Sequence, residues 1–139
     1  MISTKFHLAF PVHDLGLARK FYANILECEV GRESGNWIDF NLFGHQIVAH
    51  LSPKDCDVTM TNYVDGDSVP IRHFGLILPW TEWEKLYKNL QKNNIIFYIK
   101  PKIRFKGQNG EQGTFFLKDP SGNALEFKRF KAFKYIIKK

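Results

Sequence analysis

Three histidines and one glutamate are the side chains in this 139-residue sequence whose spacing could support metal or acid-base chemistry. His7 and His73 each lie in a β-favouring segment, on the face opposite large apolar residues. Glu126 alternates in the same way with Leu125 and Phe127. Two imidazoles and one carboxylate from three strands form a facial-triad ligand set, which leaves coordination positions open for a substrate. If these faces line one concavity, the pattern predicts a divalent metal site made of His7, His73 and Glu126. The alternative is two structural histidines and a carboxylate that faces solvent.

The third histidine, His50, has three possible roles. It alternates with Gln46 and Val48 in the last strand-like segment of the first half of the chain. If this face lines the site, His50 is either a fourth metal ligand or a general base, since imidazole moves protons near neutral pH. The other possibility is a structural histidine. His13 and His45 fall in turns, and we expect both to be exposed and without a role.

One order of elements, a strand, a helix and three strands, occurs twice along the chain. In the first half we predict a helix that begins after Asp14 and strands near 5–12, 29–33, 36–43 and 46–52. In the second half we predict a helix opened by a capping box, Thr81 to Glu84, and strands near 71–78, 95–104, 112–118 and 124–130. Neither half is long enough to enclose a sufficient core alone. We predict an α+β fold in which two βαβββ modules form a curved mixed sheet around a metal and substrate cavity.

These elements divide a single domain, residues 1–139, into four parts. Module one covers about 5–52 and module two about 70–130. Residues 53–69 between them hold four Asp with Pro53, Asn62 and Gly66 and have no clear period, which indicates a linker or loop. Residues 131–139 form a basic tail.

The composition and motifs exclude several classes of protein. No segment approaches the roughly 18 apolar residues of a membrane span, and the first residues lack the order of a signal peptide, so we expect a cytoplasmic protein with no membrane partner. Cys28 and Cys56 are expected to be reduced. The motifs of P-loops, dinucleotide sites and nucleophile elbows are absent from the sequence, which removes the usual support for nucleotide binding and nucleophilic hydrolysis.

The positive net charge of +6 comes from the C-terminal part of the chain. Residues 100–139 hold 11 Lys and Arg against three acids. Phe130, Phe133 and Tyr135 lie among these lysines and could stack on nucleic-acid bases. The simpler explanation is a solvated basic tail, and no recognition motif of a nucleic-acid module is present. We therefore expect no nucleic-acid partner.

Two motifs in this sequence resemble those of the vicinal oxygen chelate superfamily of glyoxalases, extradiol dioxygenases and bleomycin- or fosfomycin-resistance proteins. The first is Phe6-His-Leu-Ala-Phe-Pro-Val-His-Asp-Leu15 with Ala18-Arg-Lys-Phe-Tyr22, and the second is Asp119-Pro-Ser-Gly-Asn-Ala-Leu-Glu126. Together with the repeated order of elements, the resemblance covers about residues 5–130. It implies a homodimer that binds a small-molecule substrate on a divalent ion, namely Fe, Mn, Ni, Zn or Co, held by His7, His73 and Glu126.

The resemblance also implies a fourth ligand, usually Glu or Gln, at or near His50. Four protein ligands leave two octahedral positions, enough for a substrate with vicinal oxygens, whereas three also leave room for O₂. We favour the four-ligand, oxygen-independent site of an isomerase or lyase over a ring-cleaving dioxygenase. An imidazole in place of the usual carboxylate departs from the glyoxalase pattern, as does Glu27 in place of Gly after the first helix. The alternative is a metal-free, drug-sequestering binding protein with Trp37 and Phe116 in its cavity.

Overall fold

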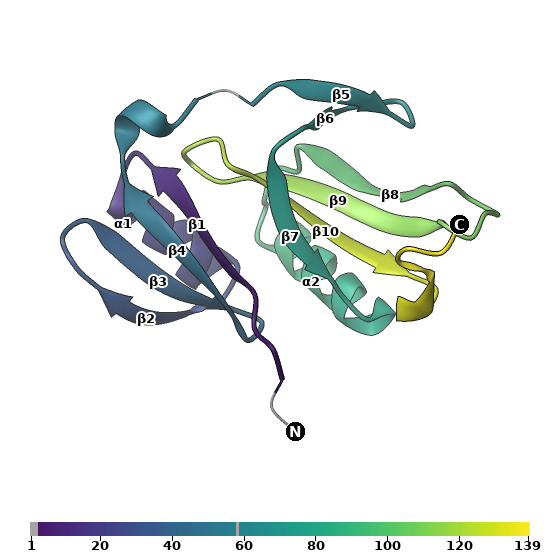
Figure 1. Cartoon of the computed structure of the whole chain (residues 1–139), viewed down its shortest axis with the longest axis horizontal. Helices are drawn as coiled ribbons and strands as arrows, with labels where there is room; N and C mark the ends of the chain where they lie inside the picture. The colour runs from purple at the N-terminus through teal and green to yellow at the C-terminus, as the bar shows by residue number, and fades with distance from the viewer. Residues whose placement is uncertain (1–2, 58) are drawn as a thin grey trace. The chain divides into compact units, whose positions relative to one another are not determined.

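The computed structural model describes residues 3–57 and 59–139 and divides them into two units (Figure 1). The first unit consists of Met1–Val58 with the loop Asp119–Asn123, and the second consists of Thr59–Lys118 with Ala124–Lys139. Each unit holds one strand-helix-strand-strand-strand repeat. The prediction of an α+β fold with two βαβββ modules is confirmed.

Module one forms a four-stranded mixed sheet in the order β1-β4-β3-β2. Its outer strand β1 runs parallel to β4, and the other neighbours are antiparallel. Its elements are β1 (His7–Val12), α1 (Leu15–Arg19), a π-helical segment (Lys20–Ile25), β2 (Glu29–Glu33), β3 (Trp37–Leu42), β4 (His45–Leu51) and a 3₁₀ turn (Pro53–Asp55).

The helix of module one begins where the sequence predicts it. Asp14 is the N-cap, and its carboxylate accepts a hydrogen bond from the backbone N–H of Leu17 at 2.9 Å. The helix buries Tyr22 against Phe10 and Phe40, with ring centroids 5.3 and 5.2 Å away. This face of the sheet is therefore apolar and covered, which leaves the other face to the polar residues of β1, β3 and β4.

The loop Asp119–Asn123 packs against module one although it connects two strands of the other module. The buried Tyr22 hydroxyl donates to Asp119 at 2.8 Å, and the Asn123 side-chain amide donates to the backbone oxygen of Pro11 at 2.8 Å. Asp119 also accepts from the backbone N–H of Ser121 and of Asn123. These bonds satisfy a buried carboxylate that would otherwise destabilise the fold.

Module two repeats the mixed sheet, in the order β7-β10-β9-β8, with β7 parallel to β10. The predicted strands at 112–118 and 124–130 have the observed bounds. Its elements are β5 (Thr61–Val64), β6 (Asp67–Pro70), β7 (His73–Ile77), α2 (Trp80–Lys92), β8 (Ile99–Arg104), β9 (Gln112–Lys118), β10 (Ala124–Phe130) and a 3₁₀ turn (Phe133–Tyr135).

The predicted capping box of α2 is wrong. The helix begins at Trp80, and its N-cap is Pro79, which makes no side-chain capping bond. Thr81 is thus already inside the helix. Glu84 accepts a hydrogen bond from Trp80 Nε1 at 2.6 Å, so its carboxylate faces the preceding turn rather than the backbone of Thr81.

The prediction that residues 53–69 form a loop is wrong in part, because β5 and β6 form a hairpin there. Asp65 and Gly66 have positive φ angles of 43° and 89°, as a tight type I′ hairpin turn requires. The strands are short and expose polar residues on both faces, so they lack the alternation that marks a strand in sequence. Arg104 of β8 holds the hairpin, since its Nη1 donates to Val64 O at 2.9 Å and its Nη2 lies 2.9 Å from Asp67 Oδ2.

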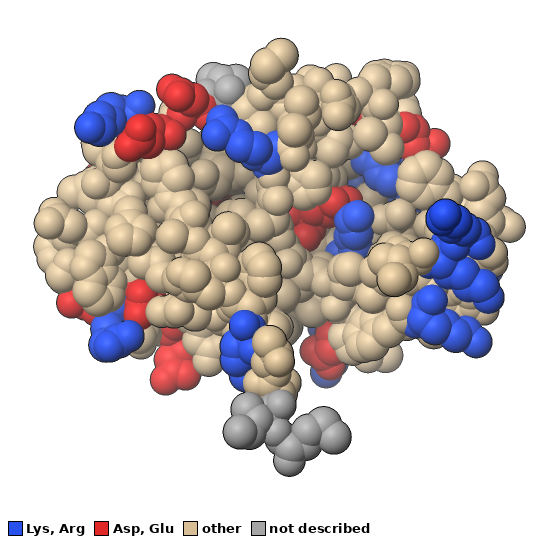
Figure 2. All heavy atoms as spheres, in the orientation of Figure 1, with Lys and Arg blue, Asp and Glu red and all other residues tan. Residues whose placement is uncertain are grey.

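The tail after β10 contributes little to the core. Phe133 and Ile137 are exposed. Blue side chains gather near the C terminus in Figure 2, in agreement with the basic tail. Among the described residues, no helix has the length and apolar character needed to cross a membrane.

Candidate functional site

His73 and Glu126 meet on one face of the module-two sheet. The register pairs His73 with Ala124 and Gly75 with Glu126, so the two side chains lie on the same face, one pleat apart. His73 Nε2 is 3.1 Å from Glu126 Oε1. Two of the three predicted ligands are therefore neighbours within one module.

The hydrogen bonds of His73 determine which of its ring nitrogens donate. Nδ1 lies 2.6 Å from the backbone oxygen of Pro70, and because a carbonyl oxygen only accepts, Nδ1 donates. Nε2 then faces a carboxylate oxygen, which also only accepts. A positive charge is needed between these two atoms, either a second proton on the ring or a metal ion. The hydrogen bond to Glu126 accordingly raises the pKa of His73 above its ordinary value, although burial opposes this.

Glu126 is held as a carboxylate in spite of its burial. Its side chain is only 8% exposed. Burial by itself raises the pKa of Glu126, but hydrogen bonds from His73 and Thr114 and the charge of Lys128 outweigh it, so the pKa is lowered. Thr114 Oγ1 donates to Oε2 at 2.5 Å, and Lys128 Nζ lies 3.5 Å from Oε1.

A small cavity of about 180 Å³ opens at this pair, and His73, Gly75, Ile77, Glu126 and Lys128 line it. Gly75 allows β7 to approach β10 closely, because a Cβ at this position would lie 1.7 Å from the backbone oxygen of Glu126. The glycine thus sets the spacing of the strands that carry the pair, in addition to leaving space beside the imidazole.

In module one, hydrogen bonds likewise fix the orientation of the His7 ring and the role of its Nδ1. Asp39 Oδ2 can only accept, so the Gln46 amide nitrogen, 3.2 Å away, donates to it. This turns the Gln46 oxygen to His7 Nδ1, at 2.8 Å, and Nδ1 must be the donor. In the neutral form of this ring, Nε2 carries the lone pair. Arg32, 3.9 Å from Asp39, adds a positive charge at the far end of this chain of contacts.

His7 and His73 thus both use Nδ1 for an oxygen acceptor, and both present Nε2. Metal-binding histidines are oriented in this way, with the second ring nitrogen bonded to a carbonyl or carboxylate. The carboxylate of Glu126 is already ionised, as a ligand must be. By their chemistry these three residues fit a divalent ion. Within residues 3–57 and 59–139, no three His, Cys, Asp or Glu side chains are grouped as a metal site.

His50 shares a sheet face with His7 but lies four residues further along. The register pairs His7 with Gln46 and Pro11 with His50, which separates the two histidine rows by about 13 Å at roughly 3.3 Å per residue. Comparison of the two modules gives a second measure of where His50 lies. Since His73 pairs with Ala124 and His7 with Gln46, the position that corresponds to Glu126 is held by Val48. This register favours the alternative in which His50 stands off from the metal.

Two histidines that we expected to have no role make specific contacts. His13 lies 2.7 Å from the Ser121 hydroxyl through Nδ1, and its backbone N–H also donates to that hydroxyl. His45 Nδ1 accepts from the backbone N–H of Phe6 at 3.0 Å. Both are structural, and His13 helps to hold the loop Asp119–Asn123.

Several polar neighbours of the site were not predicted as functional residues. Gln46, Asp39 and Thr114 orient the histidine and the carboxylate, but as single polar residues in strands they carry no distinctive sequence signal. Gln46 could have been found from the alternation that places it beside His7, had the parallel pairing of the first and last strands been assumed. Phe116, the proposed cavity residue, is fully buried and packs against the ring of His73 with centroids 5.1 Å apart.

Comparison with known proteins identifies the family. The profile of the Glyoxalase/Bleomycin resistance protein/Dioxygenase superfamily matches residues 6–127. The chain belongs to this superfamily. A search of curated proteins found no match.

Solved structures of this glyoxalase superfamily extend the match to nearly the whole chain. A glyoxalase/bleomycin resistance protein/dioxygenase from Alicyclobacillus acidocaldarius is 37% identical, with 96% of each chain covered and a TM-score of 0.83. The fosfomycin resistance protein FosX from Listeria monocytogenes is 16% identical, with 97% of this chain and 98% of FosX covered and a TM-score of 0.68. Lactoylglutathione lyase from Agrobacterium tumefaciens is 15% identical, with 92% and 94% covered and a TM-score of 0.64. The last two show a shared fold.

Membership confirms the resemblance found in the two sequence motifs. The matched range begins one residue before His7 and ends one residue after Glu126. The superfamily includes enzymes, among them the lactoylglutathione lyase, and resistance proteins such as FosX. Membership of the superfamily therefore does not select one reaction for this chain.

Proposed function

We propose that this chain is a metal-dependent enzyme in which His7, His73 and Glu126 hold a divalent ion and a small substrate binds through vicinal oxygens. The observation that supports this most is the 3.1 Å approach of His73 Nε2 to a buried carboxylate oxygen. Such a pair requires a positive charge between its atoms. When bound, a divalent ion supplies Lewis-acid polarisation of the substrate oxygens.

The protein residues have separate tasks in this proposal. Pro70 O binds Nδ1 of His73 and Gln46 binds Nδ1 of His7, which leaves Nε2 of each ring for the metal. Thr114 orients the Glu126 carboxylate through Oε2. His50, one row beyond Val48 on the polar face of module one, is the candidate general base. A substrate lying along this face passes Val48 before it reaches the His50 ring.

Three protein ligands are proposed rather than four, because Val48 holds the place in module one that Glu126 holds in module two. This set leaves more open positions than the four-ligand arrangement that the sequence favoured, and it is compatible with either an isomerase or lyase or a ring-cleaving dioxygenase. A cytoplasmic homodimer is part of the same proposal.

Elemental analysis tests the metal. The full chain, purified without chelator and supplied in turn with Fe, Mn, Ni, Zn and Co, should retain about one ion per chain, and His7→Ala, His73→Ala and Glu126→Ala should each lose it. His13→Ala is the matched control and should keep the ion. Wild-type protein that retains none of these ions under all five conditions would favour the metal-free binding protein instead.

Oxygen uptake and His50→Ala then separate the reactions. The three-ligand proposal expects His50→Ala to keep its metal and lose turnover, and an oxygen electrode with catechol-like and 2-oxoaldehyde substrates assigns the reaction. If His50→Ala loses the ion as completely as His7→Ala does, His50 is a ligand and the four-ligand site is correct.

A further inference from the structure

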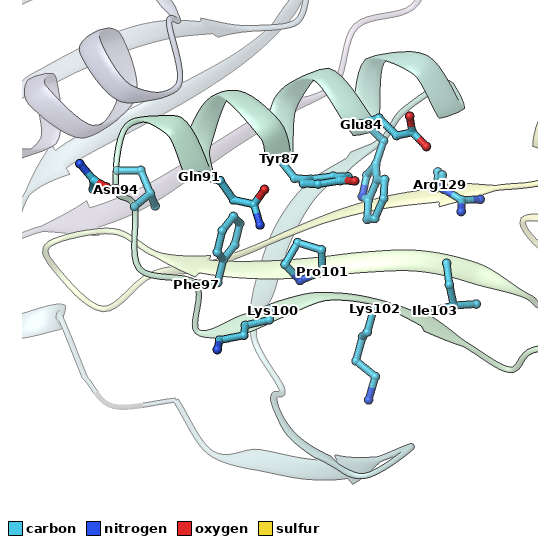
Figure 3. A pocket seen from close by; sticks show the side chains of 12 residues that line it. Glu84, Tyr87, Gln91, Asn94, Phe97, Lys100, Pro101, Lys102, Ile103 and Arg129 are labelled. Atoms are coloured by element: carbon cyan, nitrogen blue, oxygen red, sulfur yellow. The ribbon is translucent and has the colours of Figure 1, made fainter.

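A second pocket lies in module two between α2 and the sheet (Figure 3). It is open, has a volume of about 830 Å³, and shares no lining residue with the cavity at His73 and Glu126. The two are on opposite faces, because β10 alternates: Glu126 and Lys128 point to the metal-ligand face, and Phe127 and Arg129 to the helix face. The pocket is therefore separate from the proposed metal site.

Arg129 is the unusual residue of this pocket. It is only 6% exposed, and among the described residues its Nε has no hydrogen-bond partner and its guanidinium forms no ion pair with Asp or Glu. A buried guanidinium without a directly bonded carboxylate is costly, and burial lowers the pKa of Arg129, although the charges of Glu84 and Glu111 oppose this in part. Aromatic contacts offset this in part, since Arg129 Cζ lies 3.0 Å from the centroid of Trp80 and 5.3 Å from that of Trp83.

The neighbouring backbone is shaped to accommodate this arginine. A Cβ at Gly113 would lie 3.0 Å from both Cγ and Nε of Arg129. The nearest acid on the helix, Glu84, is engaged elsewhere, because one of its oxygens accepts from Trp80 Nε1 and the other lies 3.9 Å from Lys88 Nζ. Within residues 3–57 and 59–139, the Nε donor of Arg129 is thus held in place without an acceptor.

The rest of the lining combines an apolar wall with polar side chains, among them Glu84, Lys100 and Lys102. Tyr87 projects from α2, while Phe97, Pro101 and Ile103 come from the segment that leads into and along β8 (Figure 3). Arg129 is the buried cation of this pocket, and Lys100 and Lys102 on β8 add positive charge. A buried cation beside an apolar wall matches a ligand with one anionic end and an apolar body. A planar carboxylate also matches the fork of guanidinium donors better than a single-point anion does.

We propose that the pocket between α2 and β8 binds an apolar organic monocarboxylate, with the carboxylate on Arg129 and the apolar body against Tyr87, Phe97 and Ile103. Aryl carboxylates and medium-chain fatty acids share this chemistry. The site is independent of the metal and of the reaction at the other face.

Titration calorimetry on the full chain tests the proposal with four probes, namely 2-naphthoate, octanoate, neutral 2-naphthalenemethanol and inorganic phosphate. At least one carboxylate should bind with a Kd below about 1 mM, and the alcohol and phosphate at least about tenfold more weakly. Tighter binding of 2-naphthoate would indicate an aryl carboxylate as the ligand, and tighter binding of octanoate would indicate a fatty acid. No binding of either carboxylate at about 10 mM, or equal binding of the alcohol or of phosphate, overturns the proposal.

Arg129→Gln should weaken the carboxylate at least about tenfold, because it removes a charge-assisted pair. Arg72→Gln, which removes the same charge from an exposed position outside the pocket, should bind like the wild type. Equal weakening in both variants, or none in Arg129→Gln, overturns the proposal.

A second variant and a spectroscopic measurement keep the test decisive if Arg129→Gln does not fold. Ile103 is 39% exposed, so Ile103→Ser should fold, and it should weaken the carboxylate several-fold by removing part of the apolar wall. In unmodified protein the indole N–H signal of Trp83, which contacts Arg129, should shift on titration with the bound carboxylate. An unmoved signal at saturation, or unchanged affinity in Ile103→Ser, places the ligand elsewhere.

Discussion

The two modules are built on one plan, yet they prepare their histidines differently. In module two, His73 faces the buried carboxylate of Glu126 directly. In module one, the corresponding position on β4 is Val48, and His7 is oriented by the neutral amide of Gln46. One module therefore provides a histidine-carboxylate pair and the other a single imidazole bonded to an amide.

This difference shows that a repeated fold need not repeat its chemistry. The parallel pairing of first and last strands brings a histidine beside the last strand in both modules, and the residues of that strand decide what the histidine meets. A carboxylate in both modules would put a second negative charge into the site. With Val48 in its place, module one would supply only an imidazole to the proposed metal site, and the carboxylate of that site would come from module two.

Substitution of Gly75 should give the largest change in stability. The matching position in module one is Ala9, so the two positions can be compared by exchanging their residues. Gly75→Ala places a Cβ 1.7 Å from Glu126 O, so β7 must shift, and we expect a loss of about 3 kcal/mol or more in the free energy of unfolding. Ala9→Gly, the reverse exchange, should cost only about 0.5–1 kcal/mol. Urea denaturation of both variants measures this, and similar losses would mean that the strands of the two modules are equally spaced.

Gln46 gives the next largest effect, on metal affinity. Gln46→Leu removes the acceptor of His7 Nδ1, which frees the ring to rotate or change tautomer, and should weaken the proposed metal site about 10- to 100-fold. A competitive titration with a chelating dye measures this. Gln91→Leu, on a helix of module two, is the control. A Gln46→Leu variant with wild-type affinity would show that His7 needs no orienting partner.

Much of the fold could be predicted from sequence because its signals are local. The strands 112–118 and 124–130 alternate strongly, and Asp14 is followed by a helical apolar stripe, so their bounds and cap were found. The hairpin of β5 and β6 was missed because its strands expose polar side chains and depend on Arg104 and Asp67 for support, contacts that join residues 37 positions apart. The sequence contained one usable signal, the Asp65-Gly66 turn.

The site could be predicted in its residue types but not in its register. Histidines at matching places of a repeat, with a strand carboxylate, led to the proposal of His7, His73 and Glu126. The structure shows His73 beside Glu126, and their grouping with His7 around an ion stays a prediction. The place of His50 depends on how β4 pairs with β1, which no local pattern specifies. A shift of two residues in this register would put His50 instead of Val48 at the position that corresponds to Glu126.

Module one has no counterpart of the β5–β6 hairpin within its described residues 3–57, and Asp67 tests how strongly this hairpin is held. Asp67 Oδ2 lies 2.8 Å from Lys102 Nζ and 2.9 Å from the buried Arg104 Nη2. Asp67→Asn should cost about 1–2 kcal/mol at pH 7, because Arg104 loses its carboxylate. Asp65→Asn, in the exposed turn, should change stability by less than about 0.5 kcal/mol.

The same ion pair predicts a pH dependence. The hydrogen bond from Lys102 lowers the pKa of Asp67 below its ordinary value, with the charges of Lys102 and Arg104 adding to it against the opposing effect of burial. A lowered folded pKa stabilises the fold fully above the pKa of the unfolded carboxyl, near 4, and this stabilisation is lost as pH falls through the folded pKa. The difference between wild type and Asp67→Asn should therefore shrink below about pH 4. A difference that stays constant down to pH 2 would mean that the loss comes from packing rather than charge.

The basic tail extends module two alone, and its removal should have the smallest effect. Phe133 is 59% exposed and Ile137 92%, and the last residue is held by one exposed hydrogen bond from Asn109. Deletion of residues 133–139 should change the free energy of unfolding by less than about 0.5 kcal/mol and leave metal content unchanged, since so little surface is buried. The deletion removes three lysines and lowers the net charge from +6 to +3, so only salt-sensitive adsorption to DNA or RNA should fall. Binding of the intact chain to either nucleic acid that withstands about 0.2 M salt and disappears in the truncated chain would give the tail a function of its own, because charge attraction alone weakens steeply over that range. The difference between the modules would then extend to a second partner.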